Sequence, residues 1–149
     1  MKVRDIMDSS PDIVRTSDTF ENLIKILGEV KYHVVFVVDK EEKLVGIVTE
    51  GDIIKVLVPK YVTVDESLIS VMDVNYFERK CKECKDLTIN EIMSKMTFLV
   101  REEDPIIKAV ALMVVNKIHT IPVVRDGKVV GIVSRLTLIK HITKVLTEH

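Results

Sequence analysis

Apolar residues follow two different spacings along the first third of the chain. Near Phe20, four of them stand at positions i, i+3, i+4 and i+7, which puts one apolar face on a helix that stops at Gly28. Two β-branched runs follow, at residues 34–38 and 44–49, with the charged turn 40–43 between them. Near-continuous apolar strands are usually covered on both faces. The pattern therefore predicts a helix followed by a buried pair of strands.

The same pattern returns about 86 residues later. Residues 3–7 and 89–93 share the order apolar, polar, acidic, Ile, Met, and residues 46–49 match residues 131–134 after a shift of 85. The second helix begins near Ile107 and has its apolar residues at the same helical spacing. Because the register holds over about 50 residues, we interpret the chain as a duplication.

Each copy predicts five elements in the order β-α-β-β-α. The first copy supplies them at residues 13–15, 20–27, 34–38, 44–49 and 51–57, and the second at residues 98–101, 107–114, 121–125, 129–134 and 136–146. The turn between the last two strands is Asp126-Gly127, a strong hairpin signal. Thr16, Ser17 or Asp18 is expected to cap the first helix.

A three-stranded sheet with two helices is too small to bury both of its faces alone. Two copies that pack sheet to sheet solve this problem, so the sequence predicts an α/β fold made of tandem β-α-β-β-α repeats. Residues 1–57 form the first repeat and residues 87–149 the second. Residues 58–86, with Pro59 and a charged run, are expected to be an inserted, partly helical linker.

Both copies resemble the cystathionine-β-synthase-type (CBS) domain. The family's mark is an apolar strand, a turn, and then Gly, two apolar residues and Thr or Ser, with Asp three residues further on at the start of a helix. Residues 34–39 and 46–52 carry this mark in the first copy, and residues 120–124 and 131–137 in the second. The opening Val3–Met7 is also typical of the family.

The resemblance implies a tandem pair, often called a Bateman module, whose copies pack around a pseudo-two-fold axis with clefts between them. Such pairs bind AMP, ADP, ATP or S-adenosylmethionine, and two pairs often stack into a homodimer. They usually regulate another protein. The resemblance therefore implies a sensor that binds an adenosyl ligand, acts on an effector protein as partner, and is not itself an enzyme.

Thr49 and Asp52 are the main candidates for ligand contact. Thr49 can cap the helix while Asp52 sits in its first turn, which is a sufficient structural role for both. The same geometry also offers free backbone N–H groups to a phosphate. By resemblance, Asp52 accepts hydrogen bonds from the ribose hydroxyls.

The second copy departs from the family pattern. Ser134 is kept, but Thr137 stands where the acid is expected, and a hydroxyl cannot accept two ribose hydrogen bonds as a carboxylate does. Arg135 either contacts a phosphate or lies solvated on the surface. The first copy departs at Phe36, where the second has Pro122. We therefore expect two unequal clefts, of which the one with Asp52 is the better ribose site.

The remaining candidates lie where the paired strands begin. By resemblance, the backbone of Val34, Val35 and Phe36, and of Thr120, Ile121 and Pro122, reads the adenine edge. His33 and His119 occupy equivalent places, either as half-buried residues at the strand ends or in contact with phosphate.

Composition narrows the function classes. The net charge of −1 argues against a nucleic-acid partner, and the short apolar runs argue against a membrane span. Cys81 and Cys84 have the spacing of a metal or redox pair, but we expect ordinary linker cysteines, no metal and no cofactor beyond the adenosyl ligand. Catalytic motifs are absent from the sequence, and a cytoplasmic location is expected. The alternative function is a structural interaction module that binds no nucleotide.

Overall fold

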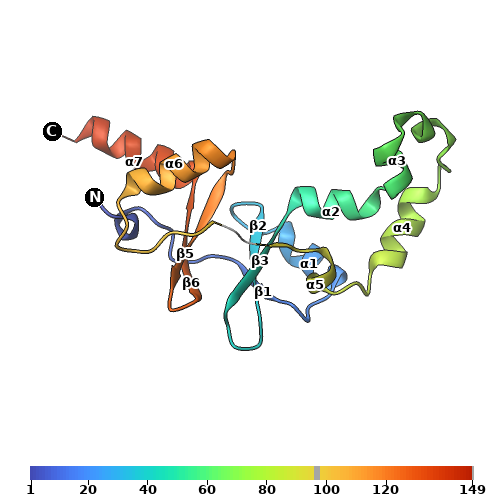
Figure 1. Cartoon of the computed structure of the whole chain (residues 1–149), viewed down its shortest axis with the longest axis horizontal. Helices are drawn as coiled ribbons and strands as arrows, with labels where there is room; N and C mark the ends of the chain where they lie inside the picture. Colours follow the sequence, from blue (N-terminus) through green and yellow to red (C-terminus); the bar gives the residue numbers. More distant parts are fainter. Residues whose placement is uncertain (96–97, 149) are drawn as a thin grey trace.

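The computed structural model describes residues 1–95 and 98–148 as two helix-flanked sheets that lie side by side (Figure 1). The first copy contributes β1 (Ile13–Arg15), α1 (Phe20–Leu27), β2 (Val34–Val38), β3 (Leu44–Thr49) and α2 (Glu50–Leu57). The second contributes α6 (Ile106–Asn116), β5 (Thr120–Arg125), β6 (Lys128–Ser134) and α7 (Arg135–Thr147). The α/β class is confirmed, and the order α-β-β-α recurs in both copies.

The two sheets have matching topologies. In the first, β1 pairs parallel to β2, and β2 pairs antiparallel to β3. In the second, β5 and β6 form the antiparallel hairpin, and Val100 makes a single parallel bridge to Val123. The hairpin turn is Asp126-Gly127, where both residues have positive φ, at 53° and 81°, as a tight primed turn requires.

Two local predictions are wrong. Residues 98–101 were expected to form a strand, but only Val100 joins the sheet, because the chain turns at once through a backbone hydrogen bond of 3.1 Å from Asp104 N–H to the carbonyl of Arg101. The cap of α1 is Thr19 rather than a residue of 16–18, since its hydroxyl accepts the N–H of Asn22 at 3.3 Å. The carboxylate of Asp18 instead accepts the N–H of Arg15.

The opening segment of each copy crosses to the other copy. Val3, in the 3-10 turn η1 (Val3–Asp5), is fully buried in the core of the second copy, and Figure 1 places the N-terminus beside α7. Ile89 and Ile92, in α5 (Ile89–Ile92), complete the core of the first copy. The division at 57 and 86 remains a prediction from the repeat, but packing follows a different division at these two segments.

Glycine permits both crossings. A Cβ on Gly46 would lie 2.9 Å from the backbone carbonyl oxygen of Ser94, and a Cβ on Gly131 would lie 3.0 Å from that of Asp8. Because backbone atoms cannot move aside as a flexible side chain can, a larger residue at either position would push the crossing segment away from the strand. The segment that crosses into the first copy, which begins with α5, ends in β4 (Ser94–Lys95), and β4 pairs antiparallel to β3.

A third apolar cluster joins the two sheets. Val34, Phe36 and Ile132 are buried there, with Tyr32 and Ile47 packed against them. Sheet-to-sheet packing is thus confirmed, and it places the starts of β2 and β5 next to each other.

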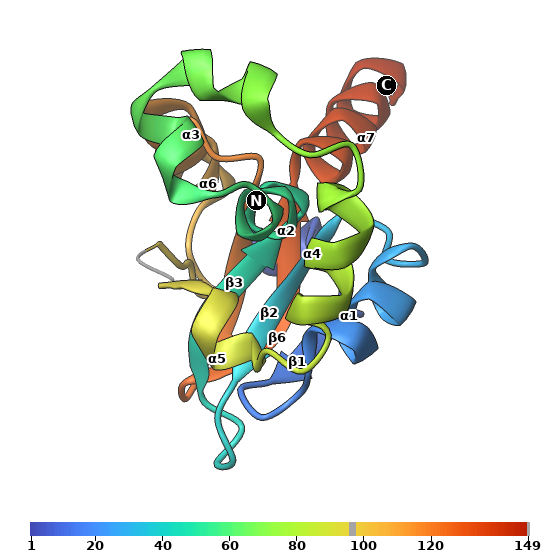
Figure 2. The ribbon, with the colours of Figure 1, turned by 90° about the vertical axis from the view of Figure 1, so that its right-hand side faces the viewer.

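The inserted linker is partly helical, as expected. It forms α3 (Lys60–Val64), the 3-10 helix η2 (Glu66–Val71) and α4 (Tyr76–Cys84). In Figure 2, α4 lies beside α1 and α2 of the first copy. Within residues 1–95 and 98–148, none of the helices combines the length and the apolar character needed to cross a lipid bilayer.

Candidate functional site

The first candidate site is a cleft of about 500 Å³ between the two copies. The first copy supplies Thr49, Glu50 and Gly51 where β3 passes into α2, and the crossing segment supplies Lys95. The opposite wall comes from the second copy, with Lys117, Ile118, His119 and Thr120 at the start of β5. A volume of this size suits a nucleoside or nucleotide.

Thr49 and Asp52 form a capping box at the start of α2. The Thr49 backbone N–H donates to Oδ2 of Asp52 at 2.9 Å, and the Thr49 hydroxyl accepts the Asp52 backbone N–H at 3.3 Å. Ser94 of the crossing strand donates its hydroxyl to Oδ1 of Asp52 at 2.9 Å. The structural role predicted for this pair is therefore present, and Oδ1 of Asp52 keeps acceptor capacity that a ligand hydroxyl can use.

His33 and His119 line the first cleft together. His33 has a positive φ of 58° and lies 3.5 Å from Oε1 of Glu50 through Nδ1. Nδ1 of His119 lies 3.3 Å from the guanidinium of Arg135. Both histidines thus stand at strand starts with a charged neighbour, and the cleft holds cationic and anionic groups side by side.

The other candidates on β2 and β5 are divided between the cleft wall and the buried cores. Val34 and Thr120 line its wall, whereas Val35 and Ile121 are fully buried in the cores of their own copies. Phe36 is fully buried between the sheets, and Pro122 is also buried. The side chains of these four residues are closed off, and their roles in reading a base through the backbone remain predictions.

The second cleft has a volume of about 310 Å³ and is lined by Asp8 of the crossing segment, Lys31 and Tyr32 before β2, and Thr137 and Lys140 of α7. Thr137 lines it but is buried in a capping box of its own. The Thr137 hydroxyl accepts the Ser134 backbone N–H at 2.9 Å and donates to the Ser134 carbonyl at 2.9 Å. Since both roles of the hydroxyl are filled, Thr137 has little left to offer a ligand.

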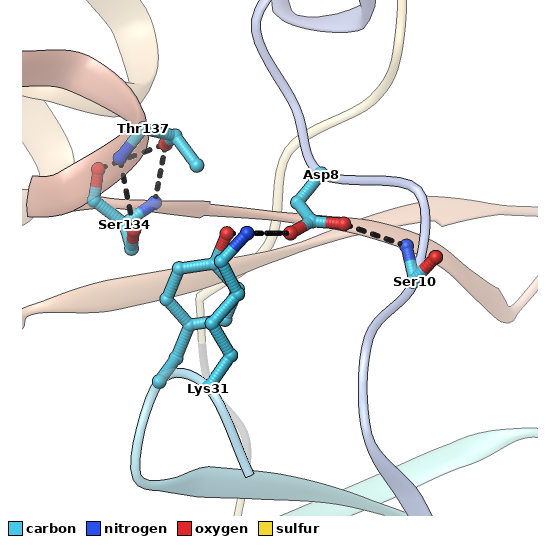
Figure 3. Close-up of polar contacts among 6 residues, drawn as sticks. Asp8, Ser10, Lys31, Ser134 and Thr137 are labelled. Atoms are coloured by element: carbon cyan, nitrogen blue, oxygen red, sulfur yellow. Dashed lines mark hydrogen bonds and ion pairs between the residues drawn. The ribbon is translucent and has the colours of Figure 1, made fainter. Parts of the chain in front are cut away.

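Asp8 is the polar centre of the second cleft, and sequence reasoning missed it. Its Oδ2 accepts the Tyr32 hydroxyl at 2.6 Å and the Lys31 ammonium at 3.2 Å, while Oδ1 accepts the Ser10 N–H at 2.9 Å (Figure 3). The hydrogen bond from Tyr32, followed by that from Ser10, holds the pKa of Asp8 below its usual value. The aligned copies contain the signal, because Asp8 falls on Ser94 at the shift of 86.

The cysteines of α4 line neither of the two clefts. Cys84 is buried in the core of the first copy, and burial raises the pKa of its thiol, which favours the unreactive neutral form. Within the described part of the chain, no group of three or more His, Cys, Asp or Glu is arranged to hold a metal ion.

The chain was compared with known families and proteins. The family model of the CBS domain matches it twice, over residues 3–59 and 89–144. The uncharacterized protein MJ1426 of Methanocaldococcus jannaschii is 29% identical over 152 residues, which cover 94% of this chain and 90% of that protein.

Solved structures share the fold. The CBS domain of a CBS-domain-containing membrane protein from Sphaerobacter thermophilus superposes with a TM-score of 0.73 at 31% identity, over 93% of this chain and 86% of that chain. The CBS domain pair of protein MJ0100, in complex with 5′-methylthioadenosine and S-adenosyl-L-methionine, gives a TM-score of 0.71 at 25% identity, over 97% of this chain and 98% of that one.

Proposed function

Because this chain belongs to the CBS-domain family, matched over residues 3–59 and 89–144, we propose that it is a regulatory module that binds an adenosyl ligand in the first cleft. Binding biases the packing of the two copies, and a partner protein reads the change. A ligand shifts such an equilibrium only through its different affinity for the two arrangements. A site that takes one wall from each copy meets this condition.

The carrying observation is the junction of β3 with α2. Oδ1 of Asp52 accepts the Ser94 hydroxyl, and because a carboxylate oxygen can accept more than one hydrogen bond, a ribose hydroxyl can bond to the same oxygen. The N-terminus of α2, an eight-residue helix, directs its free N–H groups at the same place. This pairing of a carboxylate with a helix start suits a ribose that carries an anionic group.

The walls suit the two ends of a nucleotide. Lys95 and Lys117 line the cleft with His119 and attract phosphate oxygens. Ile47 and Phe98 supply apolar surface on which a flat base packs. Support for the ligand class comes from the MJ0100 pair, which is 25% identical and was solved with two adenosyl compounds. Whether the ligand here is AMP, ADP, ATP or S-adenosylmethionine is decided by the titration described below.

We further propose a homodimer as the working form, with an effector protein as its target and the cytoplasm as its place. Support for the dimer comes from the outer faces of α6 and α7, where large apolar side chains stay in contact with solvent: Ile107, Val114, Val115, Ile139, Ile142, Val145 and Leu146. In this proposal the chain catalyses no reaction, and its output is the changed arrangement of the two copies.

Isothermal titration calorimetry with AMP, ADP, ATP and S-adenosylmethionine tests the ligand proposal. We expect saturable binding by at least one of them, and loss of that binding in Asp52→Asn. The matched control is Asp65→Asn in the linker, whose carboxylate is exposed and bonds only locally to Ser67. Absence of binding by all four at millimolar concentration would defeat the proposal.

The second candidate is an interaction module without a nucleotide, and the buried Thr137 favours it, because the second cleft lacks the acid at the usual place. Thermal unfolding separates the two functions. A ligand at 100 times its dissociation constant stabilises the folded state by about 2.7 kcal/mol. No shift with any adenosyl compound, together with an intact dimer, would favour the interaction module.

A further inference from the structure

Asp8 and Ser94 occupy the same place in the two halves of the fold. Ser94 pairs antiparallel with Ile47 on β3, and Asp8 makes the equivalent antiparallel bridge to Ile132 on β6. Ile47 and Ile132 match each other at the shift of 85. Each residue therefore comes from a crossing segment and pairs with the strand that leads into the last helix of the opposite copy.

The two clefts each pair a carboxylate with a hydroxyl, but the carboxylate is on the helix in one cleft and on the crossing segment in the other. Next to the first cleft, whose wall includes Gly51 and Lys95, the carboxylate is on the helix, at Asp52, and the hydroxyl is on the crossing segment, at Ser94. In the second cleft, the hydroxyl is on the helix, at Thr137, and the carboxylate is on the crossing segment, at Asp8. The second cleft thus keeps an acidic acceptor although its helix has lost one.

The acceptor in the second cleft is already occupied by the protein. Tyr32 and Lys31 both donate to Oδ2 of Asp8, at 2.6 and 3.2 Å. Figure 3 shows the Asp8 carboxylate in contact with Lys31 and Ser10, and it draws no contact from Asp8 to the Ser134–Thr137 cap. In the first cleft, the counterparts of Lys31 and Tyr32 are Lys117 and Ile118, and isoleucine has no hydroxyl to donate.

We propose that Asp8, rather than Thr137, accepts the hydroxyls of a ribose-containing ligand in the second cleft, and that Tyr32 and Lys31 mask the Asp8 carboxylate. This inference rests on the proposed adenosyl function of the module. The ligand class is a nucleoside with free 2′ and 3′ hydroxyls. Lys140 and Lys144 of α7 line the same cleft and are placed to take an anionic group on the sugar.

Masking makes the two sites unequal. A ligand in the second cleft has to replace the hydrogen bond between Tyr32 and Asp8, whereas a ligand in the first cleft can share the carboxylate oxygen that accepts the serine hydroxyl. Tyr32 also lines the first cleft, so its side chain borders both sites. The chain is therefore expected to bind one ligand tightly and a second one weakly.

Calorimetry with AMP on the full chain tests the inference with the wild type and three variants. We expect one tight site in the wild type, lost in Asp52→Asn. Tyr32→Phe keeps the ring and removes the donor, so it should strengthen the second site by roughly tenfold or more, the value of a hydrogen bond to a charged group. Asp8→Asn in the Tyr32→Phe background should remove that second site again. 2′-Deoxy-AMP should bind both sites more weakly than AMP.

The outcomes separate this inference from the proposed function. If Asp52→Asn abolishes wild-type binding and Tyr32→Phe adds no second site, the masking inference is wrong and the first cleft stands. A second site that survives Asp8→Asn also overturns the inference. A site in Tyr32→Phe that depends on Asp8, with no binding dependent on Asp52, supports the inference and removes the first-cleft proposal. No binding in any variant removes both.

A measurement without ligand tests the mask itself. Unfolding of wild type, Tyr32→Phe, Asp8→Asn and the double variant forms a double-mutant cycle. We expect the double variant to be as stable as the less stable of the two single variants, since both single changes break the same contact between Tyr32 and Asp8. Additive losses would show that Tyr32 and Asp8 stabilise the chain separately, and the inference that Tyr32 masks Asp8 would then be wrong.

Discussion

The two copies share their strands but differ in what covers their helices. In the first copy, α4 of the linker lies on α1 and α2, and Phe77 and Cys81 face Phe20 and Ile53 across an apolar groove. In the second copy, α6 and α7 keep large apolar residues exposed, with Val114 at 72% and Leu146 at 75%. The duplication therefore constrains the sheets, which must bury each other, and leaves the outer helix faces free to diverge.

The centre of the molecule shows the same divergence inside a shared frame. Phe36 and Pro122 stand at matching positions of β2 and β5, but Phe36 fills the space between the sheets. One large side chain from one copy thus supplies packing for both. The two copies share the course of the backbone, but their matching residues on β2 and β5 contribute unequally to the packing between the sheets.

The largest expected effect comes from this inequality. Phe36→Ala should lower the free energy of unfolding by about 3–5 kcal/mol, because it leaves a cavity between the sheets. Pro122→Ala at the matching position should cost only about 1 kcal/mol, mainly through greater freedom of the unfolded chain. Urea denaturation measures both. Similar losses in the free energy of unfolding at the two positions would show that both residues contribute equally to the packing between the sheets.

The crossing segments give the second prediction. Ile89→Ala should cost about 2–4 kcal/mol, since Ile89 is fully buried. It belongs to the second copy by sequence and to the first core by packing. Hydrogen exchange should therefore show lost protection in β2 and β3 rather than in β5 and β6. Preferential loss in β5 and β6 would contradict the crossing.

The sequence predicted the strands well because their burial on both faces leaves a continuous β-branched pattern, as in Val34–Val38. It could not predict the crossing, since residues 3–7 and 89–93 are identical in pattern whichever core they join. The close approach at Gly46 and Gly131 permits the crossing in both copies, but glycines at matching positions do not indicate which core each segment joins.

The candidate site was predicted in part for a related reason. Thr49 and Asp52 were visible because a cap and an acid three residues later are local features. Asp8 was missed because its partners Lys31 and Tyr32 are far along the chain, and its match to Ser94 changes residue type. Thr137 stands where an acid was expected, and the acidic residue of the second cleft is instead Asp8 of the crossing segment.

The exposed apolar face of α6 and α7 gives the third prediction. Ile142→Ser on α7 should weaken a homodimer at least tenfold, about 1.4 kcal/mol, with little effect on the monomer fold, because Ile142 is 55% exposed. The matched control is Ile54→Ser on α2, which is 63% exposed on the copy that the linker covers. Sedimentation velocity reads both. Equal weakening by the two changes would mean that the dimer uses the helices of both copies.

The smallest expected effect is the acid response of the second cleft. The pKa of Asp8 is lowered in the folded chain, chiefly by the hydrogen bond from Tyr32, so the ionised form stabilises folding. That contribution is complete above the unfolded value near 4 and is lost as the pH falls through the lower folded value. Asp8→Asn cannot ionise and should show a shallower fall in urea midpoint as acid is added. Because Asp104 also has a lowered pKa, through the Arg101 N–H first, the variant should keep part of the fall. An unchanged slope would mean that Asp8 contributes nothing to the acid sensitivity, and the contrast between the two clefts would then be one of shape and not of charge.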